Sequence, residues 1–68
     1  MKNAGGFELN DAEVRLVECY RSLVSVTTEQ KDQLAPYQER NALKAVAALW
    51  QIMNNLEMEP GQLYSIGA

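Results

Sequence analysis

The strongest structural signal in the chain lies in residues 36–58, which read PYQERNALKAVAALWQIMNNLEM. The stretch contains no glycine and no proline after its first residue, and it is rich in Ala, Leu, Met, Gln, Glu and Lys, which favour helices. Pro36 suits the first turn of a helix, where a backbone N–H has no partner within the helix. The sequence therefore predicts one helix from Pro36 to about Met58.

This predicted helix is apolar over roughly half of its circumference when it is projected at about 100° per residue. A helix that packs against one neighbour needs an apolar stripe of only about 100°. If another helix covers the edge that carries Trp50, the opposite edge must face a second subunit. The residues predicted to form that oligomer interface are Ala45, Ala48, Leu49, Ile52 and Leu56.

A second helix is predicted over residues 11–26. Asn10 is a favourable N-cap with Glu13 placed to close a capping box, and Leu9 and Val14 stand at the positions of a hydrophobic staple. Apolar residues then recur at helical spacing, which is typical of an amphipathic helix. We expect the buried side of this helix to carry Ala12, Leu16, Cys19, Tyr20, Leu23 and Val24.

The segment between these helices is polar. The β-branched residues around Val26 weaken a helix, and Thr27 with Gln30 has the spacing of a second capping box. The sequence therefore predicts a short connecting helix over about Thr28 to Ala35.

Both ends of the chain differ in character from the predicted helical domain, residues 7–58. Residues 1–6 are small, polar and glycine-bearing, which predicts a flexible N-terminus. Residues 59–62, Glu-Pro-Gly-Gln, favour a turn and open an apolar C-terminal tail over residues 59–68. That tail has too many large apolar residues for a solvated terminus, so we expect it to fold back or to bind a partner through Leu63, Tyr64 and Ile66.

Length and composition favour oligomerisation. A chain of 68 residues forms one domain, and a domain of this size buries only about 60% of the surface that its unfolded chain exposes. Such domains usually gain stability from a disulfide, a metal or a partner subunit. Cys19 is the only cysteine and histidine is absent, which argues against an internal disulfide and against a zinc site. The formal charge of −3 argues against nucleic acid as a partner.

The same composition argues against catalysis, a cofactor and a membrane. The commonest general base, histidine, is missing, and Cys19 is predicted to be buried. No apolar run approaches the ~18 residues of a membrane span, and the first residues lack the apolar stretch of a signal peptide, so we expect a cytoplasmic protein. Phe7, Tyr20, Tyr37 and Trp50 are expected to be core residues rather than a ligand site.

These observations predict an all-α fold: a helical hairpin with a short connecting helix, completed as a four-helix bundle by a homodimer. The expected function is that of a small non-enzymatic protein-protein interaction module, an adaptor or regulator that binds itself and an unidentified protein. Two alternatives stay open. One is a helix-turn-helix DNA-binding regulator built from Thr28–Ala35 and the start of the next helix, with Lys31, Arg40 and Lys44 as its basic residues. The other is a non-catalytic subunit of a larger enzyme complex.

Overall fold

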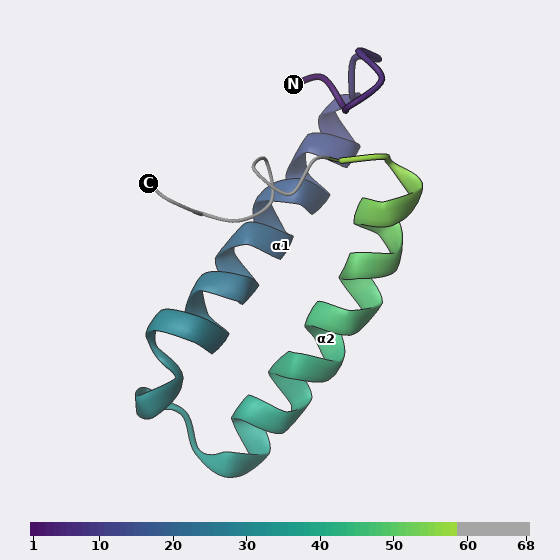
Figure 1. The fold of residues 1–68 in the computed structure, drawn as a ribbon. Helices are drawn as coiled ribbons and strands as arrows, with labels where there is room; N and C mark the ends of the chain where they lie inside the picture. Colours follow the sequence, from purple (N-terminus) through teal and green to yellow (C-terminus); the bar gives the residue numbers. More distant parts are fainter. Residues whose placement is uncertain (59–68) are drawn as a thin grey trace.

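The structure, a computed structural model, describes residues 1–58. Two long helices, α1 (Asp11–Glu29) and α2 (Pro36–Asn55), are joined by the 3₁₀ helix η1 (Lys31–Gln33). The two long helices run antiparallel and side by side (Figure 1). The predicted all-α hairpin is confirmed, and within residues 1–58 the β-structure is limited to an isolated antiparallel bridge between Lys2 and Glu8.

The N-terminus of α1 forms as the sequence predicts. The backbone N–H of Glu13 donates to Asn10 Oδ1 (2.8 Å), and the backbone N–H of Asn10 donates to Glu13 Oε1 (2.9 Å). This reciprocal pair is a capping box, which satisfies backbone N–H groups that have no acceptor within the helix. Asp11 and Glu13 also place negative charge in the first turn, where the helix dipole favours it.

The C-terminus of α1 lies beyond the predicted position. The helix continues to Glu29, and Thr27 is buried inside it rather than capping a new helix. Its hydroxyl donates to the carbonyls of Leu23 (3.0 Å) and Val24 (3.1 Å), so the polar group is satisfied by the preceding turn. Thr28 donates in the same way to Val24 (2.8 Å). The predicted short connecting helix is therefore present but smaller than the range Thr28–Ala35, since it consists of the single turn of η1.

The start of α2 at Pro36 is confirmed. The backbone N–H of Ala35 donates to Gln38 Oε1 (2.8 Å). This bond satisfies an N–H group at the helix start, where no preceding turn supplies a carbonyl acceptor. Before it, the N–H of Leu34 donates to the carbonyl of Lys31 (3.0 Å) and closes the turn of η1.

The end of α2 falls at Asn55, three residues before the predicted end. Glu57 adopts a left-handed conformation with φ 58°. The N–H of Met58 donates to the carbonyl of Met53 (3.2 Å), and that of Glu57 to the carbonyl of Asn54 (3.1 Å). This is the hydrogen-bond pattern of a Schellman motif, in which glycine is the usual left-handed residue.

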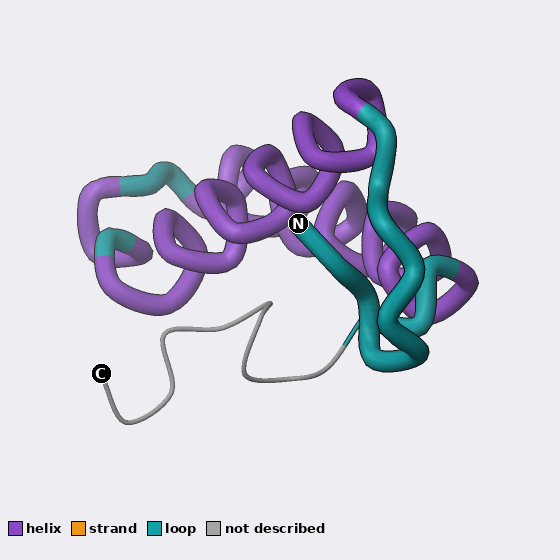
Figure 2. The backbone as a smooth tube through the Cα atoms, turned by 90° about the horizontal axis from the view of Figure 1, so that it is seen from above, coloured by secondary structure: helices purple, strands orange, loops and turns teal. Residues whose placement is uncertain are grey.

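The N-terminal segment turns back on itself and lies beside the helices (Figure 2). The side chain of Asn3 connects it to α2 by donating from Nδ2 to the carbonyl of Leu56 (2.9 Å). Ala4 adds a backbone hydrogen bond to the carbonyl of Glu57 (2.9 Å). Residues 1–6, predicted to be flexible, thus make hydrogen bonds that join the N-terminal segment to the residues that follow α2.

The core lies at this end of the hairpin. Among residues 1–58, four apolar residues are buried: Leu9, Val17, Tyr20 and Met53. They come from the N-terminal segment, the first half of α1 and the last half of α2. Half-buried residues from both helices pack around them: Val14, Leu16, Val24, Val46, Leu49, Ile52, Leu56 and Met58.

Candidate interaction surfaces

The apolar stripe of α2 meets α1 along its middle rather than along one edge. Met53 is fully buried, and Val46 and Leu49 pack against the same core. The edge that carries Trp50 and Leu43 stays open, with 44% and 48% of these residues exposed. In the structure, α1 therefore does not cover the Trp50 edge, and the wide apolar face of α2 leaves apolar surface on both sides of its contact with α1.

The five residues predicted for an oligomer interface fall into two groups. Ala45 and Ala48 are exposed, whereas Leu49, Ile52 and Leu56 are half-buried against the core of their own chain. Because Ala45 and Ala48 precede Ile52 by about two turns and one turn, all three lie along one edge of α2, opposite the Trp50 edge. The predicted tail residues Leu63, Tyr64 and Ile66 lie outside the described residues.

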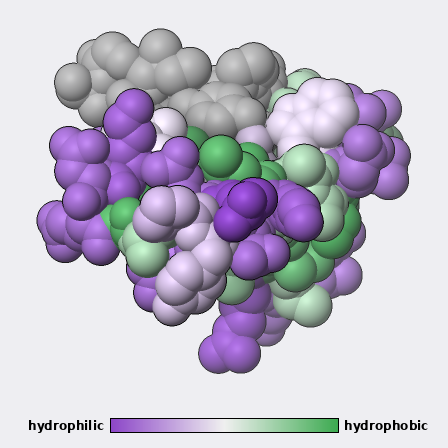
Figure 3. All heavy atoms as spheres, turned by 90° about the horizontal axis from the view of Figure 1, so that it is seen from below, coloured by the Kyte–Doolittle hydropathy of each residue, from purple (hydrophilic) through white to green (hydrophobic). Residues whose placement is uncertain are grey.

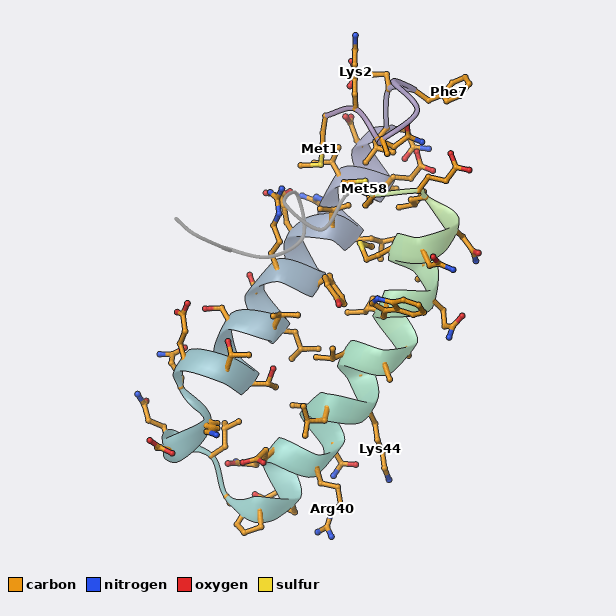
Figure 4. The ribbon with its side chains drawn as sticks, in the orientation of Figure 1. Met1, Lys2, Phe7, Arg40, Lys44 and Met58 are labelled. Atoms are coloured by element: carbon orange, nitrogen blue, oxygen red, sulfur yellow. The ribbon has the colours of Figure 1, made fainter. Side chains whose placement is uncertain are left out.

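The expectation of an aromatic core holds for Tyr20 alone. Tyr20 is buried between the helices, but Trp50 and Tyr37 are exposed and Phe7 is 72% exposed. Phe7 extends away from the helices at the N-terminal end (Figure 4). Among residues 1–58, no further long helix packs on α1 and α2 to cover large side chains at their edges.

Cys19 is exposed, which contradicts its predicted burial. The buried side of α1 instead includes Val17 and Tyr20, and Val17 is absent from the predicted set. Cys19 follows Val17 by two positions, which is about 200° around a helix, so the two side chains point in nearly opposite directions. Ala12 is exposed as well. The predicted face was rotated from the true one, and the small apolar residues Ala12 and Cys19 were the ones misplaced.

The exposed thiol lies in an apolar hollow of about 470 Å³. Its apolar wall comes from both helices, because Leu23 and Val26 of α1 join Leu49 of α2, and Glu18 and Ser22 form the polar part of the lining. On α2, Ala45 and Ile52 lie one turn before and one turn after Leu49, so the alanine edge adjoins the side of α2 that lines the hollow. We call this combined surface the Cys19 face; it consists of Cys19, Leu23, Val26, Ala45, Ala48, Leu49 and Ile52.

A second hollow, of about 710 Å³, lies near the turn between the helices. Its apolar lining consists of Leu34, Pro36, Leu43 and Ala47, and its polar lining of Glu39, Arg40 and Lys44. We call it the turn groove. In the view from this end, hydrophobic residues reach the surface between polar ones (Figure 3).

No group of three or more His, Cys, Asp or Glu side chains within residues 1–58 could hold a metal ion. An ion pair joins the N-terminal ammonium to Glu8 (2.7 Å), at the end of the molecule remote from the turn groove. Over the same residues, every buried side-chain nitrogen and oxygen has a hydrogen-bond partner. Neither α1 nor α2 is long and apolar enough to cross a membrane.

The predicted helix-turn-helix unit does not form from the residues assigned to it. Such a unit needs two helices that meet at about 90–120°. Thr28 belongs to α1, and α1 and α2 are antiparallel (Figure 1). Of the three basic residues in that region, Lys31 lies in η1, and Arg40 and Lys44 line the turn groove.

Comparison with known protein families, with curated proteins and with solved structures finds no match to this chain.

Proposed function

We propose that the protein is a small non-enzymatic protein-protein interaction module that acts as a homodimer through its Cys19 face. The observation that carries this proposal is the open apolar hollow in which Cys19, Leu23 and Val26 of α1 meet Leu49 of α2. A surface built from both helices of a hairpin is suited to receive a second hairpin, and two hairpins joined in this way form a four-helix bundle.

The small residues on this face support close packing of helices. Axes of packed helices lie about 8–10 Å apart, and the distance depends on the side chains at the contact. Ala45 and Ala48 are exposed and present only a methyl group each, so a helix of the second copy can approach α2 closely. Burial of apolar surface contributes roughly 25 cal/mol per Å², which adds to the small core that one copy buries alone.

The oligomeric state and two variants of α2 test this proposal. Light scattering coupled to gel filtration should give twice the 7.6 kDa mass of one chain. Ala48→Glu should dissociate the dimer, because it buries an unpaired carboxylate in a close helix contact, at a cost of several kcal/mol. Gln51→Glu is the matched control: it introduces the same charge in the next turn on the polar strip of α2, and it should leave the dimer intact.

Thiol reactivity gives an independent readout. Cys19 is exposed in one copy, so a disulfide reagent such as dithionitrobenzoate should label it rapidly in dilute protein. If the Cys19 face is buried in a dimer, the labelling rate should fall as protein concentration rises, and Ala48→Glu should restore fast labelling at high concentration. A monomer at tens of micromolar, with labelling independent of concentration, would overturn the proposal.

A further inference from the structure

We propose that the turn groove is a second binding surface, which docks an amphipathic segment of a partner protein that carries acidic residues along one border of its apolar side. The proposal rests on the proposed function, because the groove would be the surface through which a protein-protein interaction module binds its partner. It differs in location, since the apolar residues that α2 contributes to the groove, Leu43 and Ala47, lie on the opposite edge of α2 from Ala45.

The apolar part of the groove consists of exposed residues on one edge of α2 together with residues at the turn. Leu43 is 48% exposed although it lies in the middle of a helix. Ala47 stands one turn later, and Trp50, 44% exposed, stands two turns after Leu43 on the same edge. Leu34 and Pro36 close the groove at the turn. The edge from Leu43 to Trp50 spans about 10 Å at ~1.5 Å per residue, enough for two turns of a partner helix.

The charge of the groove sets it apart from the rest of the molecule. Arg40 and Lys44 lie one turn apart, and both extend away from α1 (Figure 4). The whole chain has a formal charge of −3, so a paired cationic border is a local reversal of sign. Glu39 lines the groove too, but it is half-buried, whereas Arg40 and Lys44 are exposed. Acidic side chains of a partner are therefore attracted to the outer border of the groove.

The same geometry favours a protein partner over nucleic acid. Binding of a DNA backbone typically depends on about 6–10 phosphate contacts from clustered basic residues. The turn groove offers Arg40 and Lys44 beside a wide apolar floor that a phosphate backbone would leave unused. An amphipathic helix in a groove uses both parts, since apolar anchors fill the floor and charges sit at the rim.

The experiment uses the full chain and a designed probe. The probe is a fluorescein-labelled helical peptide of sixteen residues with Leu on one side and Glu along one border; its counterpart has Lys in place of each Glu. Fluorescence anisotropy should show saturable binding of the Glu peptide that weakens with salt. Lys44→Glu should lower the affinity by about fivefold, the equivalent of roughly 1 kcal/mol. Leu43→Ser should lower it by a similar factor, because it removes a half-exposed apolar anchor.

A charge-reversal pair keeps the test informative if one variant is less stable. Arg40→Glu combined with Lys44→Glu should reverse the preference, so that the Lys peptide binds better than the Glu peptide. Arg15→Glu makes the same change of charge as Lys44→Glu alone, at an exposed position of α1 away from the groove, and should leave affinity for the Glu peptide within about twofold, as expected for a remote screened charge.

Three outcomes would overturn the proposal. One is peptide binding that is insensitive to both Leu43→Ser and the charge reversal. Another is tighter binding of a random DNA duplex that Leu43→Ser does not weaken, which would assign the groove to nucleic acid. The third is loss of the dimer in Leu43→Ser, which would make a second copy the occupant. Cys19→Glu separates this proposal from the previous one, because it places a charge on the Cys19 face of α1, away from Arg40 and Lys44, and should abolish the dimer while preserving affinity for the Glu peptide.

Discussion

The two ends of the hairpin are built differently. Among residues 1–58, the buried apolar residues lie toward the closed end, where residues 1–10 meet the helices: Leu9, Val17 and Met53 lie in that half, and Tyr20 lies at the middle of α1. At the turn end, around η1, the one buried residue among those described is Thr27, and Leu43 is exposed. The difference shows what a third element does for two helices. The N-terminal segment supplies Leu9 and hydrogen bonds at the closed end, whereas at the turn end none of the described segments provides such a cover and Leu43 stays at the surface.

The largest expected effect comes from truncating the core of the closed end. Met53→Ala should destabilise the fold by about 2–5 kcal/mol, the usual cost of this change at a fully buried site. Since small domains have only several kcal/mol of stability in total, the variant should be largely unfolded at ambient temperature. Circular dichroism with urea titration, at one fixed protein concentration, measures the loss.

Leu43→Ala is the matched truncation at the turn end. Leu43 is half-exposed, so its side chain buries little apolar surface when the chain folds. The truncation should therefore cost less than about 1 kcal/mol of stability. Equal losses for the two variants would show that the two ends contribute equally and that the comparison drawn from burial is wrong.

The next effect concerns the hydrogen bonds that close the hairpin. Asn3 accepts from the N–H of Phe7 (2.9 Å) and donates to the carbonyl of Leu56 (2.9 Å), so Asn3→Ala removes a link between the two ends of the chain. We expect the free energy of unfolding to fall by about 1–2 kcal/mol, which is the net contribution expected of two hydrogen bonds. Asn55→Ala on α2 changes the same side chain at an exposed position and should have little effect.

Hydrogen exchange tests the same link directly. The N–H of Ala4 donates to the carbonyl of Glu57, and protection of this amide would show that residues 1–6 are held in place. Exchange of the Ala4 amide at the rate of an unfolded peptide would support the flexible N-terminus that the sequence predicts.

A smaller effect, of opposite sign, is expected at the end of α2. Glu57 has φ 58°, a conformation that costs a residue with a Cβ roughly 1 kcal/mol relative to glycine. Glu57→Gly should therefore raise the free energy of unfolding by about 0.5–1 kcal/mol, after allowance for the greater freedom of glycine in the unfolded chain. Glu57→Ala, which keeps a Cβ, should give no such gain; an equal gain would assign the effect to the lost charge instead.

The parts of the fold that follow from local patterns could be predicted from the sequence. The capping box at Asn10, the helix start at Pro36 and the wide apolar face of α2 all depend on residues a few positions apart. The exact buried side of α1 could not be predicted in this way. It depends on which side chains α2 and the N-terminal segment meet, so Val17 was missed and Cys19 was assigned to the core.

Long-range contacts explain the other differences. The bond from Asn3 to the carbonyl of Leu56 joins residues that are 53 positions apart, and no local pattern signals it. The turn groove was not predicted either, because Leu34 and Leu43 come together only once the connection is a tight turn. One signal was present in the sequence: Arg40 and Lys44 stand one turn apart beside Leu43 on the predicted helix.

The last comparison exchanges a hydroxyl and a methyl group at the two ends of the hairpin, and the smallest effect is expected at Thr27. Thr27→Val replaces a buried hydroxyl by a methyl group. The carbonyls of Leu23 and Val24, which accept from this hydroxyl, keep their backbone hydrogen bonds within α1, so no acceptor is orphaned. Stability should change by no more than about 0.5 kcal/mol, with stabilisation the favoured direction because back-bonding slightly disfavours a helix.

Val17→Thr is the reverse exchange at the closed end, and there it should cost about 1–2 kcal/mol, because the hydroxyl would enter a fully buried apolar site. Urea denaturation of the two variants, each against the parent protein, measures both values. A cost for Thr27→Val as large as that for Val17→Thr would mean that the Thr27 hydroxyl holds the end of α1 in place. The turn end would then be stabilised by a polar contact rather than left weakly packed.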